Sequence, residues 1–209
     1  QLADDDGDGV PNYLDQCPST ADGTPVYSHN GCPITSGNTV TDIDGNTYST
    51  VEIGSQIWMK ENLKTTKYKN GDNIPQISDE YMPAYTTSGT GSYKNYNNDT
   101  STAETYGRHY NWFAASDSRG VCPEGWRVPT KNDFVSLINY VGGKANGGSL
   151  KETGYSHWSS PNTGATNSYG FKALGSGAIG LSSQLEQLNV SSSMWSITPC
   201  NDQMAYYLR

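Results

Sequence analysis

The first fifteen residues carry the pattern with the clearest chemistry, because acidic side chains alternate there with glycines. Read as a twelve-residue loop from Asp4 to Asp15, the chain has carboxylates at positions 1, 3, 5 and 12 and Gly9 at position 6. A loop of this kind binds Ca²⁺ through oxygen atoms, turns sharply at the glycine and offers a backbone carbonyl at position 7. The competing interpretation is an acidic, solvated tail. The calcium ligands predicted by the spacing are Asp4, Asp6, Asp8, Val10 and Asp15.

Two cysteines, Cys17 and Cys32, follow this loop, and each precedes a proline. A short, loop-rich segment buries too little surface to hold itself together, so metal and disulfide are the expected remedy. We therefore expect a Cys17–Cys32 disulfide, worth about 3 kcal/mol in the chain-entropy view. Zinc is the poorer alternative, because two thiols and one nearby histidine, His29, make an incomplete tetrahedral ligand set. A disulfide beside a calcium loop indicates an oxidising compartment outside the cytoplasm.

Residues 4–33 resemble a thrombospondin type-3 repeat in its bacterial form, on the acidic loop and the two Cys-Pro pairs just described. Repeats of that family are extracellular, calcium-dependent spacers that often join a functional domain to an anchor. The resemblance implies a small, disulfide-clipped calcium repeat over residues 1–34, and residues 35–39 then form a linker.

The charge of the chain argues against a nucleic-acid partner. The net charge is −8, and residues 1–34 contribute −6 of it because they hold six aspartates and no Lys or Arg. No basic face offsets the phosphate charge of a nucleic acid. No run of 18 or more apolar residues is present, so the sequence predicts no membrane span. The start at Gln1, without a Met, leads us to expect a processed or excised fragment.

Catalytic patterns are missing from the sequence. His29, His109 and His157 are scattered, and no HExxH, GxGxxG or nucleophile-elbow motif occurs. Glu124 and Glu152 are the carboxylates that a general acid–base pair would need, but sequence does not show their separation. We expect no enzymatic activity, and we expect His109, in a Tyr- and Trp-rich run, to be a packed side chain.

A tyrosine- and asparagine-rich stretch over residues 81–98 is the candidate ligand surface. Exposed aromatic rings stack on sugars while side-chain amides bond hydroxyl groups, so the predicted ligand is a glycan or a surface protein. The alternative is that these tyrosines cover small sheets. The candidate ligand residues are Tyr81, Tyr85, Tyr93, Tyr96, Asn97 and Asn98.

Local signals predict two hairpins and one helix in the remainder of the chain. Residues 40–51 alternate around the turn at Asp44–Asn46, and residues 51–58 turn at Gly54-Ser55. The Asp42/Asp44 pair is assigned to the first turn in preference to a second metal site. A helix begins after Thr130, its N-cap, and ends at Gly142-Gly143. Its predicted core-facing residues are Phe134, Leu137, Ile138 and Val141.

Several short sequence motifs between and after these elements resemble the Fibrobacter succinogenes major paralogous domain, a family abundant in surface proteins of Fibrobacter and Bacteroidetes. The similarity spans residues 40–209 and is carried by Trp58–Leu63, Tyr106–Ala114, Cys122–Thr130, His157-Trp158 and Gly170–Leu174. The stretch Gly125–Thr130 also resembles the C-type-lectin-like fold of formylglycine-generating enzymes. The implied class is α+β: short antiparallel sheets, at least one helix and long loops.

That family ends with a further strand that pairs near its first strand, whereas this chain stops at Arg209. An open sheet edge is a liability in a soluble protein. We therefore expect a truncated fragment, or a strand supplied by missing residues or by a strand-donating partner chain. The resemblance implies that Cys122 pairs with a cysteine of that strand; here it either pairs with Cys200 or stays free.

These observations predict a secreted or cell-surface module for binding and adhesion, located outside the cell or on the bacterial outer membrane. Its calcium-stabilised spacer carries a domain that recognises a glycan or a protein. The alternative is a structural subunit of a larger surface assembly, completed by strand addition. An enzyme of the formylglycine-generating type is disfavoured because Cys200 has no second cysteine near it in the sequence.

Overall fold

The computed structural model describes residues 3–7, 11–13, 15, 18–19, 39–78, 89–179, 185–201 and 204–208. The chain separates into two compact units, Gln1–Asn38 and Thr39–Arg209. The boundary between them falls within the linker predicted at residues 35–39. None of the helices in the described ranges is both long and apolar enough to cross a membrane.

The second unit mixes short helices with small antiparallel ladders, which confirms the α+β class. In the part that the structure describes, three strands form a sheet in the order β1-β2-β3, and three two-stranded ladders pair β4 with β5, β6 with β7 and β8 with β9. The strands are β1 (Thr39–Thr41), β2 (Thr47–Ile53), β3 (Gln56–Met59), β4 (Tyr93–Lys94), β5 (His109–Tyr110), β6 (Ala178–Ile179), β7 (Leu185–Glu186), β8 (Met194–Asn201) and β9 (Met204–Leu208). The helices are α2 (Thr100–Tyr106), α3 (Trp112–Ala115) and α4 (Lys131–Tyr140), with 3-10 helices η2 (Tyr96–Asn98) and η3 (Lys144–Leu150).

The two predicted hairpins form, and the first one explains the Asp42/Asp44 pair. The Asp42 carboxylate accepts bonds from the backbone N–H of Asp44 (3.0 Å) and Asn46 (2.9 Å) and from the hydroxyl of Tyr48 (2.6 Å). The Asp44 carboxylate accepts from the backbone N–H of Thr66 at 2.6 Å. Both carboxylates therefore close turns and tie loops together, as the turn interpretation predicts.

Helix α4 follows the predicted capping pattern closely. The Thr130 hydroxyl accepts a bond from the Asp133 N–H, and the Asp133 carboxylate accepts one from the Thr130 N–H, which makes a capping box. Burial raises the pKa of Asp133, but the bonds from Arg127 and Thr130 outweigh it and lower the pKa to about 2. The helix packs its buried face into an apolar cluster formed by Ile53, Phe134, Leu137, Val141, Leu150 and Phe171.

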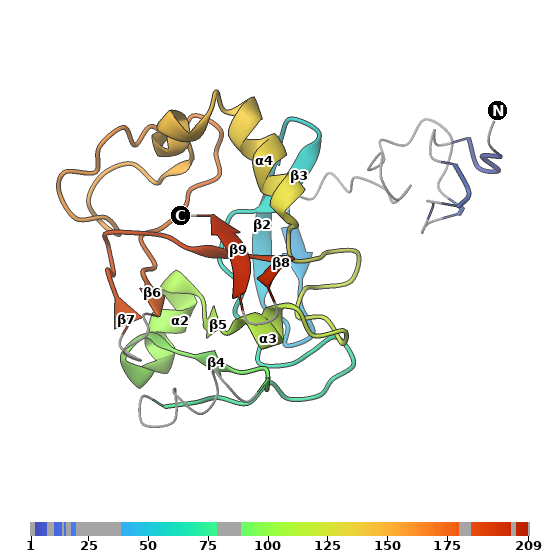
Figure 1. Ribbon diagram of the computed structural model, residues 1–209, viewed down its shortest axis with the longest axis horizontal. Coiled ribbons are helices and arrows are strands. Elements are labelled where there is room, and N and C mark those ends of the chain that lie inside the picture. Colours follow the sequence, from blue (N-terminus) through green and yellow to red (C-terminus); the bar gives the residue numbers. More distant parts are fainter. Residues whose placement is uncertain are drawn as a thin grey trace. The chain divides into compact units, whose positions relative to one another are not determined.

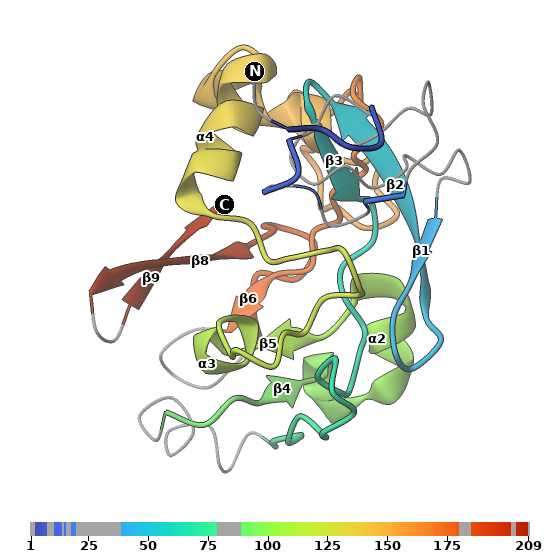
Figure 2. The ribbon, with the colours of Figure 1, turned by 90° about the vertical axis from the view of Figure 1, so that its right-hand side faces the viewer.

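A second cluster is built mainly from loops and differs in its side chains. It consists of Tyr68, Ile74, Tyr93, Ala114 and Val121. Figures 1 and 2 both show the β8–β9 hairpin between α4 on one side and the β4–β5 ladder with α3 on the other. We call these two sides the helix–sheet half, centred on the first cluster, and the loop half, centred on the second.

Candidate functional site

The candidate ligand surface at residues 81–98 is only partly supported by where its side chains lie. Tyr93 is 6 % exposed and belongs to the second cluster, so its ring is core and not a surface for stacking on sugar. The prediction for Tyr93 was wrong because its strand, β4, pairs with β5 and turns the ring inward against Tyr110. Tyr96 is partly exposed, and Asn97 and Asn98 are exposed in η2. Tyr81 and Tyr85 lie outside the described residues.

The predicted calcium loop is described in part. Asp4 Oδ1 accepts a bond from the Gly7 N–H (3.0 Å), and Asn12 Oδ1 accepts one from the Asp5 N–H (2.9 Å). The Asn12 N–H in turn bonds the Ala3 carbonyl at 2.8 Å, which closes the loop on itself. Asp6 and Asp15 also lie in described stretches, whereas Asp8, Val10, Cys17 and Cys32 lie outside them. Carboxylate oxygens on a closed loop suit a hard cation such as Ca²⁺.

The two cysteines of the second unit, Cys122 and Cys200, are free thiols in the structure. Burial raises the pKa of Cys122 to about 12, so this thiol is protonated and unreactive at neutral pH. Cys200 is exposed on β8. A bond between the two remains a prediction.

His109 lies opposite Lys94 in the β4–β5 ladder. Burial, helped by the nearby Lys94 charge, lowers the pKa of His109 to about 4, although a hydrogen bond to the Ser176 backbone acts the other way. A histidine with so low a pKa is neutral at physiological pH. The geometry therefore fits a packed side chain better than a surface acid or base.

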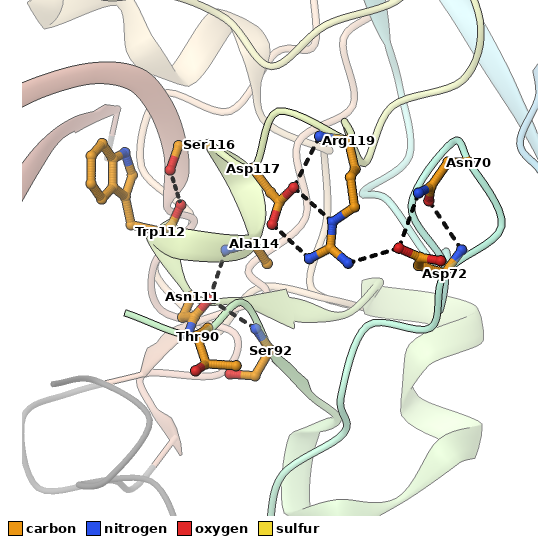
Figure 3. A network of polar contacts seen from close by, with 10 residues as sticks. All are labelled: Asn70, Asp72, Thr90, Ser92, Asn111, Trp112, Ala114, Ser116, Asp117 and Arg119. Atoms are coloured by element: carbon orange, nitrogen blue, oxygen red, sulfur yellow. Dashed lines mark hydrogen bonds and ion pairs between the residues drawn. The ribbon is translucent and has the colours of Figure 1, made fainter. Parts of the chain in front are cut away.

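One network of charged groups joins two loops around Arg119 (Figure 3). Its guanidinium donates to both oxygens of Asp117 at 2.8 and 2.9 Å and to Asp72 at 3.0 Å, and it lies 3.9 Å above the Tyr68 ring. The bonds from Arg119 lower the pKa of Asp117. The guanidinium N–H groups and the carboxylate oxygens bond one another. The network therefore holds the loops together and offers few free donors or acceptors to a ligand.

A second charged cluster, the Glu152 cluster, has a different design. Glu152 Oε2 lies 2.7 Å from His157 Nδ1, and Glu152 Oε1 lies 3.5 Å from Lys172 Nζ. Tyr106 meets the His157 ring edge-on, with centroids 5.6 Å apart, and its hydroxyl donates to Asn189 Oδ1 at 2.9 Å. We define the cluster as Tyr106, Glu152, His157, Lys172 and Asn189.

The carboxylate fixes which way the His157 ring presents its nitrogens. In the neutral imidazole, a proton on Nδ1 donates to Glu152 and leaves a lone pair on Nε2, and no group within the described ranges bonds to Nε2. The side chain of His157 is 28 % exposed, against 12 % for Glu152. The cluster therefore offers an oriented hydrogen-bond acceptor beside the Tyr106 ring. Tyr155, two residues before His157 in the chain, is 66 % exposed.

The loop that carries these groups, residues 151–177, has no regular helix or strand but is held at several points. Lys151 forms a parallel bridge with Ala173, and the Trp158 indole N–H donates to the Ala173 carbonyl at 3.0 Å. The Asn162 amide donates to the carbonyls of Glu152 (2.8 Å) and Gly154 (2.9 Å). Long loops without secondary structure are usually functional or disordered, and ties of this number favour function.

At Gly164 this loop passes so close to Gly148 of η3 that only glycine fits at position 148. A Cβ added to Gly148 would lie 2.2 Å from the carbonyl oxygen of Gly164. The two backbones touch there, and the Thr166 N–H bonds the Gly148 carbonyl at 3.1 Å. This glycine contact and the ties at Ala173 fix the base of the loop.

Sequence reasoning named Glu152 and His157 but did not bring them together. Tyr106 and Asn189 were not recognised as site residues, because their contact joins residues 83 positions apart. Glu124, the other carboxylate considered, ion-pairs with Lys69 at 3.6 Å and is not a partner for Glu152 among the described contacts. The one signal available was the spacing of five between an isolated glutamate and a histidine in a polar, glycine-containing stretch.

Comparison with known proteins gives one family. The sequence profile described as the Fibrobacter succinogenes major domain matches residues 51–208, which include every residue of the Glu152 cluster and of the Arg119 network. No curated protein matches the chain. No solved structure matches it either.

Proposed function

We propose, on the premise that the chain belongs to the Fibrobacter succinogenes major domain family, that it is an extracellular binding module and not an enzyme. The observation that carries the proposal is the Glu152 cluster. A carboxylate orients one imidazole, whose second nitrogen is open at a partly exposed position beside the Tyr106 ring. This is chemistry for accepting a hydrogen bond from a hydroxyl group while a ring covers an apolar face.

The ligand we propose is a glycan, with a surface protein as the alternative. A sugar offers hydroxyl groups to His157 Nε2 and a flat C–H face to an exposed ring such as Tyr155. The exposed Asn97 and the partly exposed Tyr96 extend the candidate surface through η2, which leads directly into helix α2 and Tyr106.

The test compares two carboxylates of the same chain. Glu152→Gln removes the charge that orients His157, whereas Glu124→Gln removes an exposed charge from the loop half. The chain is screened on a glycan array, and the best ligand is then titrated by calorimetry. We expect Glu152→Gln to weaken binding about tenfold, comparable to the loss of one charged hydrogen bond, and Glu124→Gln to leave binding unchanged. Equal affinities for both variants would show that the Glu152 cluster is not the binding site. An array on which no glycan binds would show that the ligand is not a glycan.

The first unit completes the proposal as a thrombospondin type-3-like calcium spacer. The support is the acidic loop and its closure by the bonds of Asp4, Asn12 and Ala3. In this view Ca²⁺ orders about thirty residues in an extracellular protein and takes no part in ligand binding. Chelation should raise amide exchange in residues 1–34 and leave the thermal transition of the second unit in place. Joint unfolding of both units on chelation would contradict the spacer.

The finer fold that we propose for the second unit is C-type-lectin-like. Its support is the combination of small antiparallel sheets, helix α4 after the Gly125–Thr130 stretch, and long loops.

A structural role in a surface assembly is the second candidate. Within the described residues, the outer edges of β1 and β3 pair with no further strand, so a partner could add one. Light scattering on the purified chain separates the two ideas, because a strictly monomeric, non-aggregating chain counts against strand addition.

A further inference from the structure

The sign of the charge changes sharply along the chain at the Glu152 cluster. Residues 134–185 contain three lysines (Lys144, Lys151 and Lys172) and one acidic residue, Glu152, so this segment is +2 with histidine neutral. The chain as a whole is −8, which leaves −10 for everything else. The segment that holds Glu152, His157 and Lys172 therefore carries a net positive charge in an acidic protein.

Two of these lysines, Lys151 and Lys172, lie on neighbouring segments of the loop at the cluster. The Lys151–Ala173 bridge places Lys151 beside the segment that carries Lys172. Lys172 Nζ lies 3.5 Å from Glu152, and its side chain is 56 % exposed. Lys151 Nζ lies 4.2 Å above the ring of Trp158, next to His157 in the chain. The Glu152 carboxylate therefore pairs with Lys172, whereas the Lys151 ammonium lies over an aromatic ring, so the two lysines together carry one more positive charge than this glutamate neutralises.

Lys172 is held in a left-handed backbone conformation that residues other than glycine rarely adopt. Its φ is 60°, and its N–H donates to Asn167 Oδ1 at 2.8 Å. Asn167 itself has a φ of 47°. A left-handed residue that is not glycine costs about 1–2 kcal/mol, so a chain that keeps two of them fixes the position of this lysine against a local preference.

We infer that the ligand of the Glu152 cluster is an acidic polysaccharide, bound with its carboxylate or sulfate groups on Lys172 and Lys151 and a neighbouring hydroxyl on His157 Nε2. The inference rests on the proposed binding function and deepens it by naming the ligand class. A polyuronate carries one negative charge per sugar, which suits a patch with a small excess of positive charge next to polar acceptors. A nucleic acid is a poorer fit, because its denser charge meets −10 on the rest of the chain.

The experiment titrates the full chain with polygalacturonate, with uncharged dextran and with a single-stranded oligonucleotide, each at low and at physiological salt. We expect polygalacturonate to bind most tightly and to weaken as salt rises. Lys172→Asn removes the charge and retains a residue that tolerates the left-handed backbone, so affinity for polygalacturonate should fall about twofold to fivefold without unfolding. Lys172→Arg should keep most of the affinity.

The matched control is Lys69→Gln, because Lys69 also forms a single ion pair with a glutamate, at 3.6 Å, but outside the positive segment. It should leave affinity unchanged. Equal binding of dextran and polygalacturonate, or an equal effect of Lys69→Gln and Lys172→Asn, overturns the acidic ligand and leaves the binding module standing. Preference for the oligonucleotide overturns the polysaccharide. Failure of every polysaccharide, together with an empty glycan array, counts against the glycan-binding function itself.

Discussion

The helix–sheet half and the loop half of the second unit are both packed, but they use different side chains. The cluster under α4 is purely apolar, with Ile53, Leu137 and Phe171 among its members. The cluster between the loops contains Tyr68 and Tyr93, each with an arginine guanidinium over its ring, at 3.9 and 4.9 Å. One half thus depends on the hydrophobic effect and the other adds oriented polar contacts, which are sensitive to pH and to single hydroxyl groups.

The largest effect that separates the halves is expected for Leu137→Ala. Leu137 is fully buried in the apolar cluster, and truncation leaves a cavity that costs about 2–5 kcal/mol of unfolding free energy. Urea denaturation followed by tryptophan fluorescence measures the change. Val135→Ala on the same helix, at an exposed position, serves as the control and should stay within about 0.5 kcal/mol. Similar losses for both would mean that α4 does not pack as described.

The loop half should respond to acid more than the helix–sheet half. The pKa of His109 is about 4 when folded and 6.5 in its ordinary state, so the unfolded chain takes up the proton first. The contribution of neutral His109 to the unfolding free energy is fully present above pH 6.5. As the pH falls towards 4, about 3 kcal/mol of that free energy is lost. Thermal melts from pH 7 to pH 4 should show this loss in the wild type.

The matched variant for the acid effect is His109→Gln, which removes the titrating group. Its stability should change less between pH 6.5 and pH 4 than that of the wild type. Parallel profiles for the two proteins would show that His109 is not buried in its neutral form.

A buried hydroxyl outside both clusters, that of Tyr48, should give the next effect. The Tyr48 hydroxyl donates to Asp42 at 2.6 Å and accepts from the Lys64 N–H at 2.8 Å. Tyr48→Phe leaves both partners without that bond and should lower the unfolding free energy by about 1–3 kcal/mol. Tyr140→Phe removes an exposed hydroxyl and should be close to neutral in the same chemical melts. An unchanged unfolding free energy in Tyr48→Phe would mean that Asp42 and the Lys64 N–H do not depend on this hydroxyl for their bonds.

The smallest expected effect is the loss of the cap of α4. Thr130→Ala removes the hydroxyl from the capping box and should cost about 1 kcal/mol. Ser136→Ala, at an exposed position in the middle of the same helix, is the comparison and should be neutral or slightly stabilising. Circular dichroism during thermal unfolding measures both. A cap variant as stable as the wild type would show that packing alone sets the start of α4.

The same contrast explains what the sequence could predict. Helix α4 and the two hairpins follow from signals within a few residues, such as the Thr130 cap and the Asp42 turn. The orientation of Tyr93 depends on a ladder with Tyr110, seventeen residues away, so its apparent exposure in a polar stretch was misleading. The Glu152–His157 contact depends on the path of an irregular loop, and periodicity carries no information about such a path.

The glycine contact at Gly148 and Gly164 and the ties at Ala173 also say something about how this surface could diversify. They separate a fixed base from exposed tip positions such as Thr153, Tyr155 and Ser159, whose side chains support none of those ties. Substitutions at the tip would alter recognition at little expense to folding, as in the variable loops of antibodies on a constant framework. Paralogues that share this base are expected to differ chiefly at the tip, and libraries randomised at those positions should retain a high proportion of folded members.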